Sequence, residues 1–127
     1  MNTRTIIAPQ ANLETAEYWQ AANAGKLLLK RCCDTGQAFH YPRDRSPFTG
    51  GATEWFEASG RATLYSYSVL LRGPAPYCLA YVQLAEGPLM MSNILTDDFE
   101  RLRIGQDLSL DFLDSGTGQQ LPVFRPA

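Results

Sequence analysis

The chain has 127 residues, of which 45% are hydrophobic and 19% charged, and its formal net charge is −2. This composition is typical of a compact soluble protein, and the acidic balance argues against general binding to polyanions such as nucleic acid. No apolar run approaches the roughly 20 residues that span a bilayer, and the N-terminal stretch is unlike a secretory signal. Three cysteines do not make a disulfide framework. We therefore expect a cytoplasmic protein with no membrane contact.

The first predicted element is a helix near the N-terminus. Asn12 is a good N-cap and Gly25 a natural terminator, so residues 14–24 are predicted to be helical. Tyr18 and Trp19 fall on one side of this helix at helical spacing. Such a face is usually buried against its own fold, but Tyr and Trp are also favoured at interfaces. The sequence leaves both roles open.

The next segment, residues 26–53, has the spacing of a rubredoxin-like zinc ribbon from which most metal ligands have been lost. A structural ribbon has two Cys-x-x-Cys knuckles, each followed by glycine, so that four thiolates surround one Zn²⁺. Gly36 and Gly50 keep this punctuation. The four ligand positions are occupied by Cys32, Thr35, Ser46 and Thr49. Hydroxyls are poor zinc ligands, so we expect the shape without the metal, and no other cofactor.

A ribbon without zinc needs other contacts, because structural zinc contributes on the order of 10 kcal/mol to a metal-dependent fold. We expect the three hydroxyls to bond the amides of the knuckles. The aromatic residues expected to pack in place of the metal are Phe39, Tyr41 and Phe48. His40 is the one residue able to add a nitrogen ligand, but Cys32 and His40 alone are too few for a tight zinc site.

From residue 54 onward the pattern changes to strands of period 2. Five strands are predicted, with a short helical turn between the third and the fourth. They cover 55–71 with a bend at Gly60, then 77–84, 89–95, 106–113 and 121–124. This number and order are those of an OB-fold barrel. The predicted fold is mainly β, with an arm and helix over 1–25, a ribbon remnant over 26–53 and a five-stranded OB-fold barrel over 54–127.

The charges are unevenly distributed along the chain. Residues 26–45 hold five basic and two acidic side chains within an acidic protein. The basic ones are Lys26, Lys30, Arg31, Arg43 and Arg45. A local basic surface of this kind fits a small anionic ligand or an acidic patch on a partner, and a simple solvated face is the alternative.

Two further functions have candidate residues. Cys33 and His40, on neighbouring predicted strands, are the one pairing of a nucleophile with a base; the alternative is an ordinary thiol and a surface imidazole. A single-stranded nucleic-acid-binding OB-fold needs stacking aromatics in a basic groove. The candidate aromatics are Tyr65, Tyr67, Tyr77 and Tyr81. Residues 54–95 carry more acidic than basic side chains, which argues against this function.

Short motifs run through residues 13–127 in a definite order. They are Tyr18-Trp19, Gly25-Lys26-Leu27-Leu28, Arg31-Cys32 with Gly36, Pro42-Arg43, Gly60-Arg61-Ala62-Thr63-Leu64-Tyr65-Ser66-Tyr67, Glu86-Gly87-Pro88, Ile104-Gly105 and Pro122-Val123-Phe124-Arg125-Pro126. In order and spacing they resemble the acyl-CoA-associated zinc-ribbon/OB-fold proteins of a "domain of unknown function" group. The chain departs from that family in its ligand set, because Cys32 is the one cysteine left of four.

The resemblance implies a non-catalytic accessory or scaffold subunit. Members of the family accompany thiolase-type enzymes, aldolases or hydratases that act on CoA thioesters, and their helix and ribbon are suspected of contacting the acyl-CoA or the enzyme. The resemblance therefore implies a homo- or hetero-oligomer with such an enzyme, and acyl-CoA as a candidate ligand. The residues expected at this contact surface are Tyr18, Trp19, Lys26, Lys30, Arg31, Phe39, Tyr41, Arg43 and Arg45.

Overall fold

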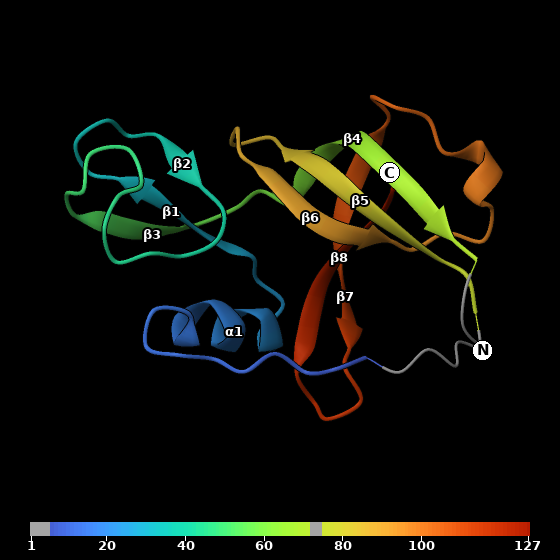
Figure 1. Cartoon of the computed structure of the whole chain (residues 1–127), viewed down its shortest axis with the longest axis horizontal. Coiled ribbons are helices and arrows are strands. Elements are labelled where there is room, and N and C mark those ends of the chain that lie inside the picture. Colours follow the sequence, from blue (N-terminus) through green and yellow to red (C-terminus); the bar gives the residue numbers. More distant parts are fainter. Residues whose placement is uncertain (1–5, 72–74) are drawn as a thin grey trace.

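The computed structural model describes residues 6–71 and 75–127 (Figure 1), so residues 1–5 of the expected arm lie outside the described part. The elements are α1 (Ala16–Asn23), β1 (Leu28–Cys32), β2 (Ala38–Phe39), β3 (Thr53–Glu57), β4 (Arg61–Leu70), β5 (Tyr77–Leu84), β6 (Leu89–Ile94), the 3₁₀-helix η1 (Phe99–Arg101), β7 (Asp107–Asp114) and β8 (Gln120–Pro126). Within the two described ranges, no helix has the length and apolar character that crossing a membrane requires.

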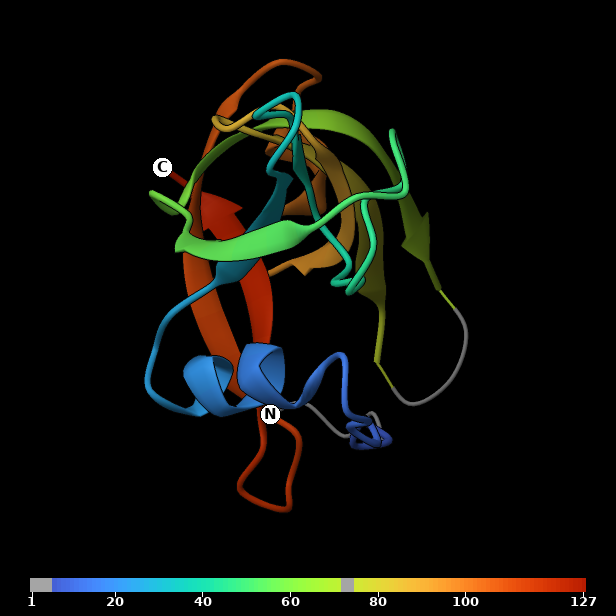
Figure 2. The same ribbon diagram turned by 90° about the vertical axis from the view of Figure 1, so that its left-hand side faces the viewer.

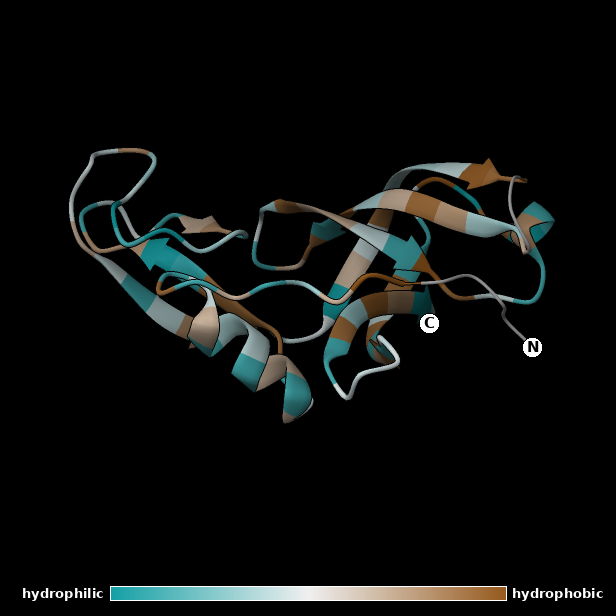
Figure 3. Cartoon of the chain, turned by 60° about the horizontal axis from the view of Figure 1, so that its bottom comes forward, coloured by the Kyte–Doolittle hydropathy of each residue, from teal (hydrophilic) through white to brown (hydrophobic). Residues whose placement is uncertain are grey.

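Strands β4 to β8 close into a five-stranded barrel in the order β4-β5-β6-β8-β7. The pair β6 and β8 is parallel and joins at Ile94 and Phe124. Figure 3 shows hydrophobic and hydrophilic bands along the strands. Buried and more exposed positions alternate along β5 and β6, since successive side chains point to opposite sides of a strand. Leu64, Val82 and Leu108 are among the fully buried side chains inside the barrel. The mainly β fold with a five-stranded OB-fold barrel is confirmed.

Strands β1, β2 and β3 form a separate antiparallel sheet with β1 in the middle. The place of β3 differs from the sequence expectation, in which residues 55–58 lead into the first barrel strand. Instead β3 pairs along its whole length with β1, with Trp55 opposite Lys30, and the first barrel strand begins at Arg61. The alternating pattern of this segment suits either sheet, so local periodicity does not reveal its partner strand. The chain passes between the sheets at Gly60, which has a positive φ of 87°.

Helix α1 connects the two sheets. It packs against β8 of the barrel and against β1 of the three-stranded sheet (Figures 1 and 2). At its C-terminal end the Asn23 side-chain oxygen accepts the amide hydrogen of Gln120 at 2.8 Å. The Gln119 side chain donates to the Trp19 carbonyl at 3.1 Å. These bonds join residues about a hundred positions apart, and they fix the helix to the hairpin between β7 and β8.

The helix begins at Ala16, two residues later than predicted. Asn12 forms a turn in front of it, because its side-chain oxygen accepts the amide hydrogens of Glu14 and Thr15 at 3.0 and 3.1 Å. Tyr18 is 2% exposed, so the helical face that carries it is buried against the protein's own fold. The sequence left open whether Tyr18 packs inside the protein or on a partner, and its burial shows that it packs inside.

Candidate ligand and partner surfaces

Two turns in the segment predicted to be a ribbon remnant share one backbone pattern; we call residues 32–37 and 46–51 the ribbon turns. In each, the amide of the glycine, Gly36 or Gly50, donates to the carbonyl of the first residue, at 2.7 and 2.9 Å. In each, the amide of the first residue donates to the carbonyl of the last, at 2.9 and 2.8 Å. The two glycines have φ angles of 75° and 76°, in the left-handed region that favours glycine. The ribbon turns are therefore near copies of each other.

Side chains from both turns converge on the sulfur of Cys32, which is fully buried. The hydroxyls of Ser46, Thr35 and Thr49 lie within hydrogen-bond distance of this sulfur, and the Thr49 oxygen is 3.6 Å from it. Hydrogen bonds from Ser46, and then from Thr35, lower the pKa of the Cys32 thiol below its ordinary value. Thr49 also donates to the Asp34 carboxylate at 2.7 Å. One thiol and three hydroxyls thus form a connected hydrogen-bonded cluster.

Each of the three hydroxyls also accepts an amide hydrogen bond, as the sequence predicts. The Ser46 oxygen accepts from the amides of Phe48 and Thr49, at 3.0 and 3.3 Å. The Thr35 and Thr49 oxygens each accept from the amide two residues further on, at 3.2 and 3.1 Å. The rings of Phe39 and Phe48 pack edge to face with their centroids 6.0 Å apart. Both kinds of contact hold the turns together.

The residues at the four ligand positions do not fit a zinc ion. Structural zinc takes four thiolate or imidazole ligands, and this cluster offers a single thiol. In the part of the chain that the structure describes, no three or more His, Cys, Asp or Glu residues are grouped so as to hold a metal. His40, which the sequence offers as an extra ligand, has its Nε2 atom bound to the Tyr18 hydroxyl.

Tyr18, Trp19, His40 and Tyr41 form an aromatic cluster between α1 and the segment that follows β2. The Tyr18 ring is central, with centroid distances of 4.8, 5.7 and 5.9 Å to the other three rings. The Tyr18 hydroxyl lies 2.9 Å from His40 Nε2. Burial raises the pKa of Tyr18 and lowers the pKa of His40 to about 4. Both groups are neutral at pH 7, and the tautomer of the His40 ring sets which of the two donates.

Cys33 and His40 do not form a nucleophile–base pair. The Cys33 side chain is exposed, and it makes no hydrogen bond to His40 among the described residues. A cysteine nucleophile needs an adjacent base or another means of lowering its pKa. The geometry therefore gives Cys33 no activating base.

Lys30, expected to meet an anion, is buried instead. Its ammonium nitrogen donates to the Thr53 hydroxyl at 3.0 Å and lies 3.9 Å from an Asp44 carboxylate oxygen. It also lies 4.6 Å from the centroid of the Trp55 ring. The side chain keeps only 7% of its exposure. Lys30 thus binds the loop after β2 to the sheet, and its charge is already matched.

Arg31 lies apart from the other basic residues. It forms an ion pair with Glu54 at 3.0 Å and stacks over the Phe56 ring at 4.2 Å. Arg31 and Phe56 help to line a cleft of about 440 Å³ that also includes Glu86 and Pro88 of the hairpin between β5 and β6. Arg31 therefore faces the junction between the three-stranded sheet and the barrel.

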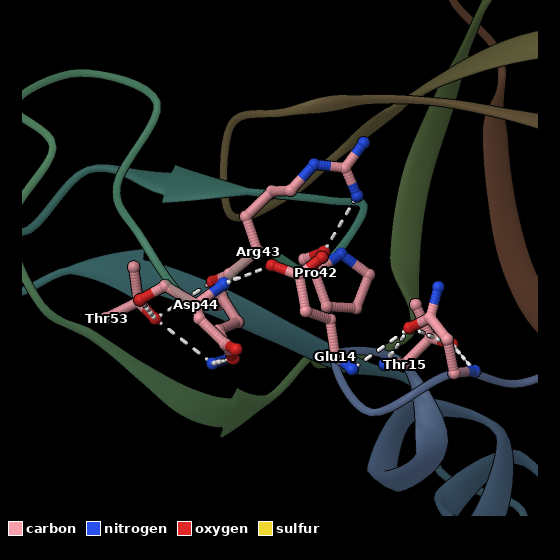
Figure 4. Close-up of polar contacts among 8 residues, drawn as sticks. Glu14, Thr15, Pro42, Arg43, Asp44 and Thr53 are labelled. Carbon is pink, nitrogen blue, oxygen red and sulfur yellow. Dashed lines mark hydrogen bonds and ion pairs between the residues drawn. The ribbon is translucent and has the colours of Figure 1, made fainter.

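Arg43 is exposed on a loop that several bonds hold in place (Figure 4). The Glu14 carboxylate accepts the Asp44 amide hydrogen at 2.8 Å. The Thr53 hydroxyl donates to the carbonyls of Arg43 and Asp44, at 3.0 and 3.1 Å. The Arg43 guanidinium donates to the Pro42 carbonyl at 3.0 Å. The loop backbone is thus fixed while the arginine faces solvent.

Arg43 has an exposed aromatic neighbour, Tyr41, and an exposed basic neighbour, Arg45. Its guanidinium carbon is 5.7 Å from the centroid of the Tyr41 ring, which is itself 44% exposed. Arg45 is exposed on the same loop and donates weakly to the Gly50 carbonyl at 3.5 Å. We call Tyr41, Arg43 and Arg45 the basic rim. Lys26 is also exposed, at the start of the segment that leads into β1.

A second surface, on the outside of β4, β5 and β6, is not predicted as a contact surface for a partner, although the sequence offers Tyr65 and Tyr81 as stacking aromatics. It consists of Tyr65, Leu79, Tyr81, Leu89 and Met91, whose exposed fractions lie between 39% and 55%. We call these five residues the barrel face. Tyr81 and Met91 are directly opposite each other in the β5–β6 pair. Neither β5 nor β6 contains an Asp, Glu, Lys or Arg residue. The sequence signal for this face is the absence of charged residues from both sides of β5 and β6.

Comparison with known proteins identifies the family. Residues 55–113 match the family model described as "ChsH2, C-terminal OB-fold domain". The solved structure of an "Ltp2-ChsH2(DUF35) aldolase" contains a similar chain, with a TM-score of 0.84, 31% identity, and coverage of 94% of this chain and 98% of that one. A DUF35 domain-containing scaffold protein of Pyrococcus furiosus is 24% identical over 105 residues, 77% of each chain. The chain belongs to the acyl-CoA-associated DUF35 family.

The chain is also similar to two further proteins. A probable enoyl-CoA hydratase alpha subunit of Thermomonospora curvata is 32% identical over 126 residues. The match covers 94% of this chain but 39% of that protein, so this chain spans about two fifths of its length. A DUF35 protein of unknown function from Sulfolobus solfataricus has a TM-score of 0.67 at 11% identity, which supports the fold alone.

Proposed function

We propose that this DUF35 protein is a non-catalytic accessory subunit that docks on an enzyme of CoA-thioester metabolism, such as a thiolase, an aldolase or a hydratase. The observation that carries the proposal is the barrel face. This face exposes two tyrosines, two leucines and a methionine. Four of the five lie on β5 and β6, which contain no charged residue. Contiguous exposed apolar surface marks interaction sites, and aromatic and methionine side chains are enriched at interfaces.

The relatives support the same class of partner. The similar solved chain belongs to an aldolase structure that also names Ltp2. One relative is called a scaffold protein and another a hydratase alpha subunit. We infer that the enzyme partner supplies the catalytic groups, since Cys33 and His40 of this chain are not paired.

The basic rim is the place where an acyl-CoA would bring its phosphates. Phosphate groups favour arginine, and Arg43 and Arg45 are exposed beside the Tyr41 ring. Of the contact set that the sequence predicts, Tyr18, Lys30 and Phe39 are buried and Arg31 is paired with Glu54. The members that are open to a ligand or partner are Trp19 in part, Lys26, Tyr41, Arg43 and Arg45.

Capture from the native host tests the docking. A tagged full-length chain should retain an enzyme that acts on CoA thioesters, identified by mass spectrometry and by assay with its acyl-CoA substrate. The variant Tyr81→Asp/Met91→Asp places two charges on the barrel face and should weaken capture more than tenfold. Arg61→Glu, also exposed on β4, is the matched control and should capture normally. Capture of no such enzyme, or equal capture by the barrel-face variant, would refute the docking.

A second assay tests the anionic ligand. Isothermal titration of the captured complex with acetyl-CoA should show binding that Arg43→Glu/Arg45→Glu weakens and Arg61→Glu does not. Equal effects of both variants would mean that CoA is bound elsewhere. A single-stranded oligonucleotide should bind neither form, since OB-folds that bind nucleic acid need a basic groove. Tight, salt-dependent oligonucleotide binding would favour the nucleic-acid function instead.

A further inference from the structure

We propose that residues 32–51 are a metal-free ribbon whose backbone keeps the shape of a site for one metal ion and four cysteines. Hydrogen bonds to the Cys32 sulfur take the place of the metal–ligand bonds. This inference concerns how the ribbon is held together and does not depend on the proposed function. It begins from the two ribbon turns, which repeat the same hydrogen bonds and the same positive φ at an offset of 14 residues. The first and fourth residues of both turns, Cys32, Thr35, Ser46 and Thr49, are in contact at the Cys32 sulfur.

The distance between the side-chain atoms of Cys32 and Thr49 is close to that between two ligands of one zinc ion. Zinc–sulfur bonds of about 2.3 Å in a tetrahedron place neighbouring ligand atoms about 3.8 Å apart. The Cys32 sulfur and the Thr49 oxygen are separated by 3.6 Å. The hydroxyls of Thr35 and Ser46 are directed at the same sulfur. Side chains from all four ligand positions thus meet at one sulfur, and three of the four contribute oxygen.

The hydroxyls also take over a second task of ligand sulfurs. In both turns the threonine oxygen accepts the amide hydrogen two residues further on, Gln37 in the first turn and Gly51 in the second. Ser46, which is 4% exposed, accepts two amides. An amide that is shielded from water and left without an acceptor costs stability, and the two amide bonds to Ser46 are partly buried. The substituted side chains therefore satisfy the backbone and bind the centre, and no ion is needed.

Restoring the cysteines tests the geometry. The variant Thr35→Cys/Ser46→Cys/Thr49→Cys should bind about one zinc per chain, and cobalt should give the absorption of a tetrahedral thiolate site. The matched control is Ser68→Cys/Ser109→Cys/Thr117→Cys, which adds one cysteine on β4, one on β7 and one in the loop between β7 and β8. It should bind no stoichiometric metal. A folded triple variant that remains metal-free, or a control that binds equally well, would overturn the proposal.

The unaltered protein provides an independent test. After dialysis it should contain no stoichiometric zinc by elemental analysis, and its unfolding midpoint should be the same with and without EDTA. About one zinc per chain, or a midpoint that EDTA lowers, would show that the ribbon is held by metal and would overturn the proposal.

A single substitution keeps the geometry testable if the triple variant does not fold. Thr49→Cys places a second thiol beside Cys32, so oxidised glutathione should produce a Cys32 to position 49 disulfide that peptide mapping locates. The neighbouring Cys33, which is exposed, is the internal control. Crosslinking through Cys33, or no crosslink, would show that the two turns do not converge on Cys32.

Discussion

The barrel and the ribbon turns differ in how their residues are protected from water. In the barrel, large side chains such as Val82 and Phe124 are completely buried, and every strand contributes to one continuous hydrophobic cluster. In the two ribbon turns only Cys32 and Ser46 are buried, and the remaining residues are exposed or nearly so. The turns are held by a few directed hydrogen bonds around a single sulfur.

This difference determines how each region responds to change. Burial of apolar surface contributes about 25 cal/mol per Å² and is spread over many residues. A hydrogen bond contributes about 1 kcal/mol net, but leaving its buried partner unsatisfied costs more. The barrel should therefore lose most stability when a large core side chain is removed. The turns should lose their local structure when one small polar group is removed.

The largest effect is expected at Phe124, which is fully buried where β6 and β8 meet. Phe124→Ala should lower the free energy of unfolding by about 3–5 kcal/mol, because it leaves a cavity in the core. Urea denaturation of the full chain measures this loss. Phe48→Ala removes the same side chain from the ribbon, where it is 43% exposed, and should cost about 1 kcal/mol. Equal losses at both positions would contradict the contrast between the two regions.

The next largest effect is a loss of stability at acidic pH that comes from His40. The pKa of His40 in the folded protein, about 4, is below its ordinary value of about 6.5. Between these values the unfolded chain binds more protons, so stability falls as the pH is lowered from 6.5 to 4, by about 3 kcal/mol at most. Above pH 6.5 this contribution does not change with pH.

This acid response can be measured directly, because His40 is the one histidine of the chain. An NMR titration should show the His40 ring protonating near pH 4. Thermal unfolding of His40→Gln should lose the part of the pH dependence between 4 and 6.5, while Tyr18 and Tyr41 keep their packing. A His40 pKa near 6.5 in the folded protein would show that the Tyr18 contact does not exclude water.

A smaller, local effect is expected at Ser46. Ser46→Ala removes the acceptor of two amides and a donor to Cys32, which should cost about 1–3 kcal/mol. Amide hydrogen exchange should accelerate over the ribbon turns and stay unchanged in the barrel. Ser109→Ala, at an exposed position of β7, is the control and should change neither. Faster exchange throughout the barrel would mean that the two regions unfold as one unit.

The smallest effect is expected at Glu14. Glu14→Ala removes the acceptor of the Asp44 amide in an exposed contact and should cost about 0.5–1 kcal/mol. Glu14→Gln keeps a side-chain oxygen at that place and should retain most of the stability. Hydrogen exchange of the Asp44 amide is the measurement. Unchanged exchange in Glu14→Ala would show that the loop does not depend on the helix.

The barrel could be predicted from the sequence because its information is local. Alternating apolar residues and glycine-containing turns mark each strand, and their number and order identify the fold. The turns at 32–37 and 46–51 were also readable, since Gly36 and Gly50 mark them, while their descent from a zinc ribbon stays a prediction. The partner of β3 was not readable, because the pairing of Trp55 with Lys30 joins residues 25 positions apart. Its pattern agrees equally with either sheet.

The candidate site was harder to predict because it depends on tertiary contacts. Lysine is almost never fully buried, so nothing near Lys30 in the sequence indicates that Trp55 and Thr53 enclose it. His40 gains its partner from a helix that lies 22 residues earlier. On β4, a bulge after Leu64 shifts the register, so simple alternation does not assign the outward tyrosines. These features require the three-dimensional arrangement.

Helix α1 has a consequence for binding strength. Its Asn23 is bonded to the barrel hairpin, and Glu14, two residues before the helix begins, is bonded to the loop that carries Arg43 and Arg45. One short segment therefore connects the barrel to the loop of the basic rim. A partner that has bound the barrel face or the basic rim then meets the other at a high effective concentration, if its own geometry spans both. Two contacts that are each weak would then give a high overall affinity for the partner. No flexible linker between them would have to be ordered on binding.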